Sequence, residues 1–290
     1  MVLSTIVLGI INSVILALLA LGFNLTFGIS GVSNFAYGGL YIFGGLITWV
    51  LLNILNLPYI VAVMLSVLIT AVLGAIIYRL VLQRVRGIEL SEVIATFGIG
   101  LAVLELFRYL GFYGFDYTLP PIIEGSIDLI VVTVSVQHFL IVFIGIGLAG
   151  GIWLFTHHTK IGLAFRGIAQ EENTALTLGI DSDFIAMLSV AFGSAIAAIS
   201  AIAILPLGTI AIEQGYMVLI NALAVSIVGG LGSSGGIILA AFIIGFAQTF
   251  TSAYIDSKWV MVVPSMFILI VLAFKPSGLF GKQKELEERV

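Results

Sequence analysis

The first charged residue of this chain is Arg79. The preceding stretch, Met1 to Tyr78, contains no Asp, Glu, Lys or Arg, whereas a typical soluble protein would place roughly 20 charges in a segment of that length. Of all 290 residues, 61% are hydrophobic and only 9% are charged. So few ionisable groups cannot cover a water-exposed surface. The sequence therefore predicts an all-α polytopic membrane protein.

The composition also excludes several kinds of site. The chain has no Cys, so it can form no disulfide framework, no thiolate metal site and no thiol nucleophile. Its histidines, His138, His157 and His158, are too few and too scattered for a rich metal cluster. No Gly-x-x-x-x-Gly-Lys-Ser/Thr phosphate loop is present, so any ATP used must be hydrolysed by another chain. We expect membrane lipid around the chain, and no cofactor, metal or nucleic-acid partner.

Apolar runs place the membrane spans. A spanning helix needs about 20 mainly apolar residues. The run Val218–Val228 holds only 11 residues before a glycine cluster, so it is either a short span or a re-entrant half-helix. We predict about eight transmembrane helices in one permease-like domain, 1–290. The candidates are Thr5–Phe27, Leu40–Leu55, Tyr59–Leu80, Val93–Phe112, His138–Phe155, Phe184–Leu205, Val218–Val228, Ile237–Tyr254 and Trp259–Phe274.

The basic residues indicate the orientation of these spans. Nine of the eleven Lys and Arg lie in 79–92, in 157–183 or at the C-terminal end, whereas 113–137 holds three acids and no basic residue. Basic residues accumulate on the cytoplasmic side. We therefore predict a multi-pass protein of the cell (inner or plasma) membrane, with a cytoplasmic loop 157–183, a cytoplasmic C-terminal tail 281–290 and segment 113–137 outside.

Two glycine-rich segments, 28–39 and 229–236, interrupt the apolar pattern. Each Gly costs a helix about 1 kcal/mol relative to Ala, and irregular backbone at membrane depth is tolerated only in protein or beside a water-filled cavity. Because transporters use such discontinuous helices at substrate sites, we predict that both segments belong to a translocation path. The candidate path residues are Ser33, Asn34, Tyr37, Gly38, Gly230, Gly232, Ser233 and, in another Gly-flanked break, Glu213.

Alternatives remain for these segments. Small residues also let membrane helices pack closely, which is the favoured interpretation for Gly147–Gly151, inside a continuous span. For 28–39, Ser33 and Asn34 would each need a hydrogen-bond partner in lipid, which favours a path or gate. Glu213 either lines the path or faces the outer water.

The polar loop contains a predicted short helix, 170–178. Glu171 and Glu172 lie in its first turn, where the helix dipole favours acids, and Gly179 stands just after its end. A helix of nine residues is too short to be stable alone, so it rests on lipid headgroups, on this chain or on a partner.

Five motifs in order resemble the permease subunits of ABC importers for branched-chain amino acids, the LivH type. The resemblance covers nearly the whole chain, with Tyr37 where the family has His. The motifs are Asn34-Phe35-Ala36-Tyr37-Gly38, Ile94-Ala95-Thr96-Phe97-Gly98, Gly162-Leu163-Ala164-Phe165-Arg166-Gly167-Ile168-Ala169-Gln170, Val228-Gly229-Gly230-Leu231-Gly232-Ser233 and Lys275-Pro276-Ser277-Gly278-Leu279-Phe280-Gly281.

The resemblance implies a complex with a second related permease subunit, two ABC ATPase subunits and an extracytoplasmic substrate-binding protein. It also implies that the loop couples the permease to the ATPases, although Asn173 stands where the Glu of a Glu-Ala-Ala-x-x-x-Gly pattern is expected. The implied coupling residues are Arg166, Gln170, Glu171, Glu172, Asn173, Thr174, Ala175, Leu176 and Gly179.

The expected cargo is net neutral. A path lined by backbone dipoles, Ser and Asn suits a zwitterion or an uncharged solute better than an ion. We expect branched-chain or other aliphatic amino acids moved by alternating access, with urea or short amides as the alternative. The rival from another class is an ion-coupled secondary transporter, which would normally carry an ionisable pair at mid-membrane.

Overall fold

The computed structural model describes residues 2–112, 117–129 and 132–281. Within these residues, seven helical segments are long and apolar enough to cross a membrane, and two apolar helices are shorter. The long segments are α1 (Val2–Ser30), α3 (Tyr59–Ile77) with its extension to Val85, α5 (Glu89–Tyr109), α6 (Val136–His158), α9 (Ser182–Ile204), α11 (Ser234–Tyr254) and α12 (Val262–Phe274) with the turn before it; the short ones are α2 (Tyr37–Asn53) and α10 (Gln214–Gly229).

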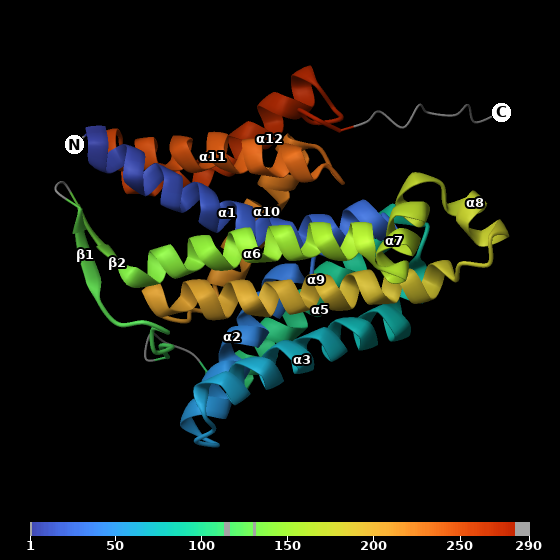
Figure 1. Cartoon of the computed structure of the whole chain (residues 1–290), viewed down its shortest axis with the longest axis horizontal. Coiled ribbons are helices and arrows are strands. Elements are labelled where there is room, and N and C mark those ends of the chain that lie inside the picture. Colours follow the sequence, from blue (N-terminus) through green and yellow to red (C-terminus); the bar gives the residue numbers. More distant parts are fainter. Residues whose placement is uncertain (1, 113–116, 130–131, 282–290) are drawn as a thin grey trace.

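The remaining elements lie mainly at the two ends of the helix bundle (Figure 1). An antiparallel hairpin lies at one end and α8 at the other, which we call the hairpin end and the α8 end. The N-terminus is at the hairpin end. These elements are η1 (Tyr78–Leu82), α4 (Gln83–Val85), β1 (Ser126–Leu129), β2 (Val132–Ser135), α7 (Lys160–Gln170), α8 (Glu172–Thr177), η2 (Leu205–Leu207) and η3 (Ser257–Met261).

The span prediction is confirmed, with nine apolar helices matching the nine candidate runs. Burial differs strongly among them: 67% of the α9 span is buried inside the chain, against 11% for α6 and 6% for α12. Moving an apolar side chain from lipid to a helix interface gives no hydrophobic free energy. Membrane helices therefore associate through the close packing of small residues. Many buried residues of α9 are accordingly Ala, Ser or Gly.

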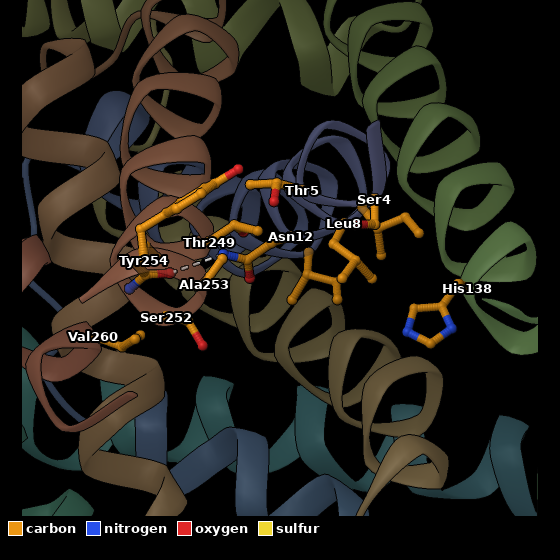
Figure 2. Close-up of a pocket in the computed structure, with 13 residues that line it drawn as sticks. Ser4, Thr5, Leu8, Asn12, His138, Thr249, Ser252, Ala253, Tyr254 and Val260 are labelled. Carbon is orange, nitrogen blue, oxygen red and sulfur yellow. Dashed lines mark hydrogen bonds between the residues drawn. The ribbon is translucent and has the colours of Figure 1, made fainter. Parts of the chain in front are cut away.

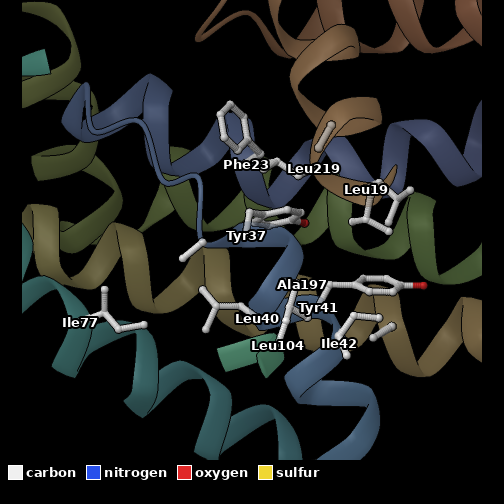
Figure 3. Close-up of a cluster of buried hydrophobic side chains, with 14 of the residues drawn as sticks. Leu19, Phe23, Tyr37, Leu40, Tyr41, Ile42, Ile77, Leu104, Ala197 and Leu219 are labelled. Atoms are coloured by element: carbon white, nitrogen blue, oxygen red, sulfur yellow. The ribbon is translucent and has the colours of Figure 1, made fainter. Parts of the chain in front are cut away.

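The centre of the bundle forms where α1, α2 and α9 meet. Figure 3 shows Phe23 of α1, Tyr37 and Leu40 of α2, and Ala197 of α9 in one buried cluster. The rings of Phe23 and Tyr37 meet edge to face with centroids 6.1 Å apart. Tyr37 is the first residue of α2, so this contact fixes the point inside the bundle at which α2 begins.

The first predicted break, 28–39, is shorter in the structure, and both of its predicted bounds are wrong. α1 continues through Ser30 and α2 begins at Tyr37, so only residues 31–36 are irregular. The glycines near the helix ends mediate close contacts: a Cβ added at Gly28 would lie 2.8 Å from the Cα of Gly232, and one at Gly39 would lie 2.8 Å from the carbonyl oxygen of Gly100. Tertiary packing at these positions offsets the low helix propensity of Gly.

The second break is also shorter than predicted, because α10 includes Gly229 and α11 starts at Ser234. Residues of the C-terminal motif, 275–281, form hydrogen bonds with the backbone at this break. The Leu279 amide donates to the Val228 carbonyl over 2.8 Å, and the Phe280 amide donates to the Gly229 carbonyl over 3.0 Å. Gly230 has φ +98°, which favours Gly. Only Gly281 of the predicted tail 281–290 belongs to the described residues.

The packing predicted for Gly147–Gly151 does not occur within the described part of the chain. Cβ atoms added at Gly147, Gly150 and Gly151 would meet no atom within 4 Å. This face of α6 is therefore open to lipid or to another chain.

The close helix contacts predict which glycines tolerate a methyl group. In Gly38→Ala the new methyl would overlap the backbone carbonyl of Gly215, so the free energy of unfolding should fall by about 1–3 kcal/mol. Gly98→Ala is the matched control on α5, because no atom lies within 4 Å of its added Cβ. Thermal unfolding in detergent measures both; equal stability of the two variants would contradict the contact.

Candidate functional site

The two short helices begin beside each other inside the bundle. Gly38 in the first turn of α2 lies against the backbone of Gly215 in the first turn of α10. The Tyr37 side chain contacts the Gly22 position of α1, which also lies next to the carbonyl of Gly193 at the middle of α9. The N-terminal ends of two helices, which carry partial positive charge, therefore meet in the middle of a membrane bundle.

A short irregular segment leads into α2, and α5 satisfies its backbone. The Thr96 hydroxyl accepts from the Phe35 amide over 3.0 Å and lies 3.1 Å from the Ser33 carbonyl oxygen, to which it can donate. The Asn34 side-chain oxygen accepts from the Ala36 amide over 3.1 Å. Thr96 belongs to one of the five family motifs, but its contacts with residues about 60 positions earlier leave no local signal in the sequence that would indicate this role.

Two polar atoms in this region are buried without a hydrogen-bond partner in the part of the chain that the structure describes. They are the Asn34 side-chain nitrogen and the Tyr37 hydroxyl, on residues that are each only 1% exposed. Unpaired buried polar atoms are rare and call for an explanation. Ser33, Asn34, Tyr37 and Gly38, all predicted path residues, are thus gathered where polar groups remain available in the bundle interior.

The second predicted set lies at the end of α1 near α8. The Gly232 amide donates to the Asn24 side-chain oxygen over 2.9 Å, and the Ser233 hydroxyl accepts from the Gly236 amide over 3.1 Å, which caps α11. Gly230 lies against the C-terminal motif. The structure therefore gives each of these residues a role at a helix end.

Glu213 lies in an exposed ion-pair cluster near the hairpin end. Arg108 contacts Glu105 over 3.0 Å, as the spacing of three residues predicts, and contacts Glu213 over 2.9 Å. All three side chains are more than two-fifths exposed. The pairing with Glu213 is long-range, so the sequence alone could not indicate it. This environment favours the interpretation that Glu213 faces water.

The polar loop is more helical than predicted. The prediction of a single helix over 170–178 is wrong. Instead, α7 occupies 160–170, Glu171 is extended, and α8 covers only 172–177. The Thr159 hydroxyl accepts from the Gly162 amide over 2.9 Å and so starts a separate helix after α6. Gly179 has φ +83° and reverses the chain after α8.

The helix α8 has one buried face and one exposed face. Ala175 is 3% exposed and packs in a cluster with Ile29, Phe165 and Ile185, whereas Leu176 is 49% and Leu178 77% exposed. The α7–α8 unit is therefore anchored to the bundle while it presents two leucines outward. The other predicted coupling residues on this unit are Arg166, whose Nε is buried without a partner among the described residues, and Gln170, Glu171, Asn173 and Thr174, which are exposed.

Arg86 links α8 to the rest of the protein, through partners that lie too far away in the sequence to be predicted from it. One guanidinium nitrogen contacts Asp183 over 2.9 Å, and the other contacts Glu172 over 2.8 Å. The second nitrogen also donates to the Ser182 hydroxyl, which itself donates to Glu172. Only 16% of the Arg86 side chain is exposed. The bidentate geometry is one that Lys could not reproduce.

The same cluster extends to the end of α3. The Tyr78 hydroxyl and the Gln83 side-chain amide each donate to Asp183 over 3.1 Å. Tyr78 begins η1, a π-helical turn, and such turns often occur at functional sites. The extension of α3, the start of α9 and the first turn of α8 are therefore held together by one hydrogen-bonded cluster.

The fold is that of a multi-pass membrane protein. The family model described as "Branched-chain amino acid transport system / permease component" matches residues 5–272, and the chain belongs to this family. Similar relatives include the high-affinity branched-chain amino acid transport system permease proteins BraD of Pseudomonas aeruginosa, 27% identical over 92% of this chain and 91% of that protein, and LivH of Escherichia coli, 26% identical over 92% and 91%.

An archaeal relative and a solved structure extend the comparison. The probable branched-chain amino acid transport permease protein LivH of Methanocaldococcus jannaschii is 28% identical over 94% of this chain and 90% of that protein. The structure of PsaBC from Streptococcus pneumoniae in complex with Fab matches with a TM-score of 0.51 over 95% of this chain and 94% of that chain. At 12% sequence identity, this likeness supports the fold alone.

The Arg86 cluster predicts how α8 is held. Arg86→Met should leave Glu172 and Asp183 without their cation and lower the free energy of unfolding by about 1–2 kcal/mol, between the values for surface and buried pairs. Hydrogen exchange in 171–181 should accelerate. Arg84→Met changes an exposed arginine two residues earlier and serves as the control. Unchanged exchange in Arg86→Met would show that α8 is held by its apolar contacts alone.

Proposed function

We propose that this chain is the membrane-spanning permease subunit of an ATP-driven ABC importer for branched-chain or other aliphatic amino acids. The partners are a second related permease, two ABC ATPase subunits and an extracytoplasmic binding protein. The family of the chain and the names of its relatives support this proposal. The observation that carries it is the α8 unit, which is clamped to the ends of α3 and α9 and exposes Leu176 and Leu178 away from the bundle.

The proposed orientation places the α8 end in the cytoplasm. Arg79, Arg84, Arg86, Lys160 and Lys275 all lie in or next to elements at that end, as the positive-inside rule requires. The C-terminus then lies on the cytoplasmic side and the N-terminal end of α1 on the outer side. ATPase subunits would dock on α8, and a binding protein would deliver its cargo at the hairpin end.

The proposed mechanism is alternating access driven through α8. Closure of the ATPase pair upon ATP binding would displace α8. Since Arg86 joins α8 to the ends of α3 and α9, the displacement would reach both spans as a rigid movement. The contact between the starts of α2 and α10, with Asn34 and Tyr37 beside it, lies where such a movement would open and close the path.

The main rival is an ion-coupled secondary transporter. Such a protein normally carries an ionisable group at mid-membrane. Among the described spans, the one buried acid is Glu92, which is 5% exposed and accepts a hydrogen bond from the Gly87 amide over 2.8 Å. Glu92 therefore caps the start of α5 near the α8 end. This arrangement supports the ATP-driven mechanism over ion coupling. Urea or a short amide remains the second candidate cargo, because neither carries a net charge.

A reconstitution experiment tests the proposal. Proteoliposomes that contain the chain, its partner permease, the ATPases and the binding protein should accumulate L-leucine only with hydrolysable ATP. Urea should compete weakly. Accumulation driven by a sodium or proton gradient, by the chain alone, would contradict the proposal.

The exposed leucines of α8 predict the site of coupling. The double variant Leu176→Asp/Leu178→Asp should lose at least about tenfold of leucine-stimulated ATP hydrolysis, because two carboxylates would enter an apolar contact. Membrane insertion should be normal, since neither side chain is buried. Phe280→Asp is the control, because Phe280 is also exposed, at 57%, but belongs to the C-terminal motif and not to α8. Equal stimulation in the double variant and the wild type would place the ATPase contact elsewhere.

A further inference from the structure

A cavity of about 550 Å³, lined by both polar and apolar residues, lies at the hairpin end of the bundle. Its walls come from the first turns of α1 and α6, the last turns of α11, and η3 (Figure 2). The volume is in the range of small-molecule sites. The polar lining includes Thr5, Asn12, His138, Gln248, Thr249 and Ser252. This concentration of hydroxyl and amide groups is unusual for membrane helices, in which polar side chains are costly.

A chain of amides links three helices at one wall of the cavity. The Asn12 side-chain nitrogen donates to the Gly245 carbonyl over 3.2 Å and to the Gln248 side-chain oxygen over 3.1 Å. The Gln248 side-chain nitrogen donates in turn to Asn221 of α10 over 3.1 Å. The Asn12 amide oxygen accepts no hydrogen bond from the described residues, so an acceptor remains available to a bound molecule.

The lining selects for a molecule without net charge. No Asp, Glu, Lys or Arg is present among the residues that line the cavity, so neither a cation nor an anion would find a counter-charge there. A zwitterion carries a donor head and an acceptor head. The amide oxygen of Asn12 can accept from the ammonium group, as can the Thr249 hydroxyl oxygen, whose proton goes to the Gly245 carbonyl over 2.9 Å. The Ser252 hydroxyl, which lies 3.3 Å from the Ser257 hydroxyl, can turn to donate to the carboxylate. A second, apolar cavity of about 370 Å³ shares the walls formed by Thr5 and Tyr254.

The apolar cavity provides room for an aliphatic group. Its walls include Ile6, Phe246 and Phe250. A molecule with a zwitterionic head and a short aliphatic side chain could therefore place its head against Asn12 and its side chain against these residues.

We propose that this cavity is an outer binding site for a zwitterionic aliphatic amino acid, occupied before the solute reaches the contact between α2 and α10. The inference rests on the proposed function, which sets the direction of travel from the hairpin end to the α8 end. Asn12 lies ten residues into α1, about 15 Å along the helix, so the site is inside the outer half of the span. Toward the α8 end, Ser13 packs against the backbone of Gly245 and closes this side.

The absence of natural Cys allows a direct test by thiol labelling. Thr249→Cys and Ser252→Cys should react with a membrane-impermeant methanethiosulfonate in right-side-out vesicles that carry the assembled, nucleotide-free transporter. L-Leucine should slow both reactions at least about fivefold, whereas L-lysine should not, because a bound solute excludes the reagent. Ser126→Cys, on the exposed strand β1, should react equally fast with and without leucine.

Each outcome of the labelling decides the inference. Protection by leucine supports the site even if the vesicles accumulate no leucine, in which case the proposed function alone fails. Failure of the two variants to react, or reaction that leucine does not slow, overturns the site even if ATP-dependent uptake is intact. Protection by added phospholipid but not by leucine would assign the cavity to lipid instead.

A kinetic variant gives a second, independent readout. Asn12→Leu should raise the leucine concentration for half-maximal uptake about five- to tenfold, the effect of one lost hydrogen bond, with a smaller change in maximal rate. Ser66→Ala also removes a buried hydrogen bond within a span, to the Gly44 carbonyl, but lies outside the cavity and should leave that concentration unchanged. Equal shifts in both variants would show a general loss of stability and overturn the assignment.

Discussion

Backbone polar groups inside a bilayer have no water to bind, and this constraint governs every irregular part of the structure. The segment before α2 uses Thr96 of α5 and the side chain of Asn34. The segment between α10 and α11 uses Asn24 of α1 and the C-terminal motif. Each interruption of a helix therefore requires a partner from a distant part of the chain, which binds the bundle together at the same points.

The close approach of helices has a separate cause in the bilayer. Since lipid supplies no hydrophobic driving force between helices, contact depends on small residues, and glycines lie where α2 meets α10 and where α1 meets the α10–α11 connection. The packing interpretation of the glycine segments is thus supported, and the path interpretation stays a prediction. The glycines at 28 and 39 pack helices together, whereas Asn34 and Tyr37 keep unpaired polar atoms in the interior.

Much of the fold could be predicted from the sequence, because apolar runs of bilayer length have one stable outcome. The spans, the pair of Glu105 with Arg108 and the reversal at Gly179 are of this local kind. The exact helix ends at Ser30, Tyr37 and Gly229 depend on contacts with distant residues. The low helix propensity of Gly, which is a local property, therefore predicted longer breaks than the structure has. Arg86, Thr96 and the Asn12–Gln248–Asn221 chain were missed because their partners lie far away in sequence.

The C-terminal motif has a consequence for biogenesis. The carbonyls of Val228 and Gly229 receive their hydrogen bonds from residues about 50 positions later. During synthesis α10 would therefore enter the bilayer before the donors for its last carbonyls exist, and only later synthesis of the segment that contains Leu279 and Phe280 would supply them. Quality-control proteases in the membrane could thus recognise a chain that lacks this segment by a single exposed helix terminus.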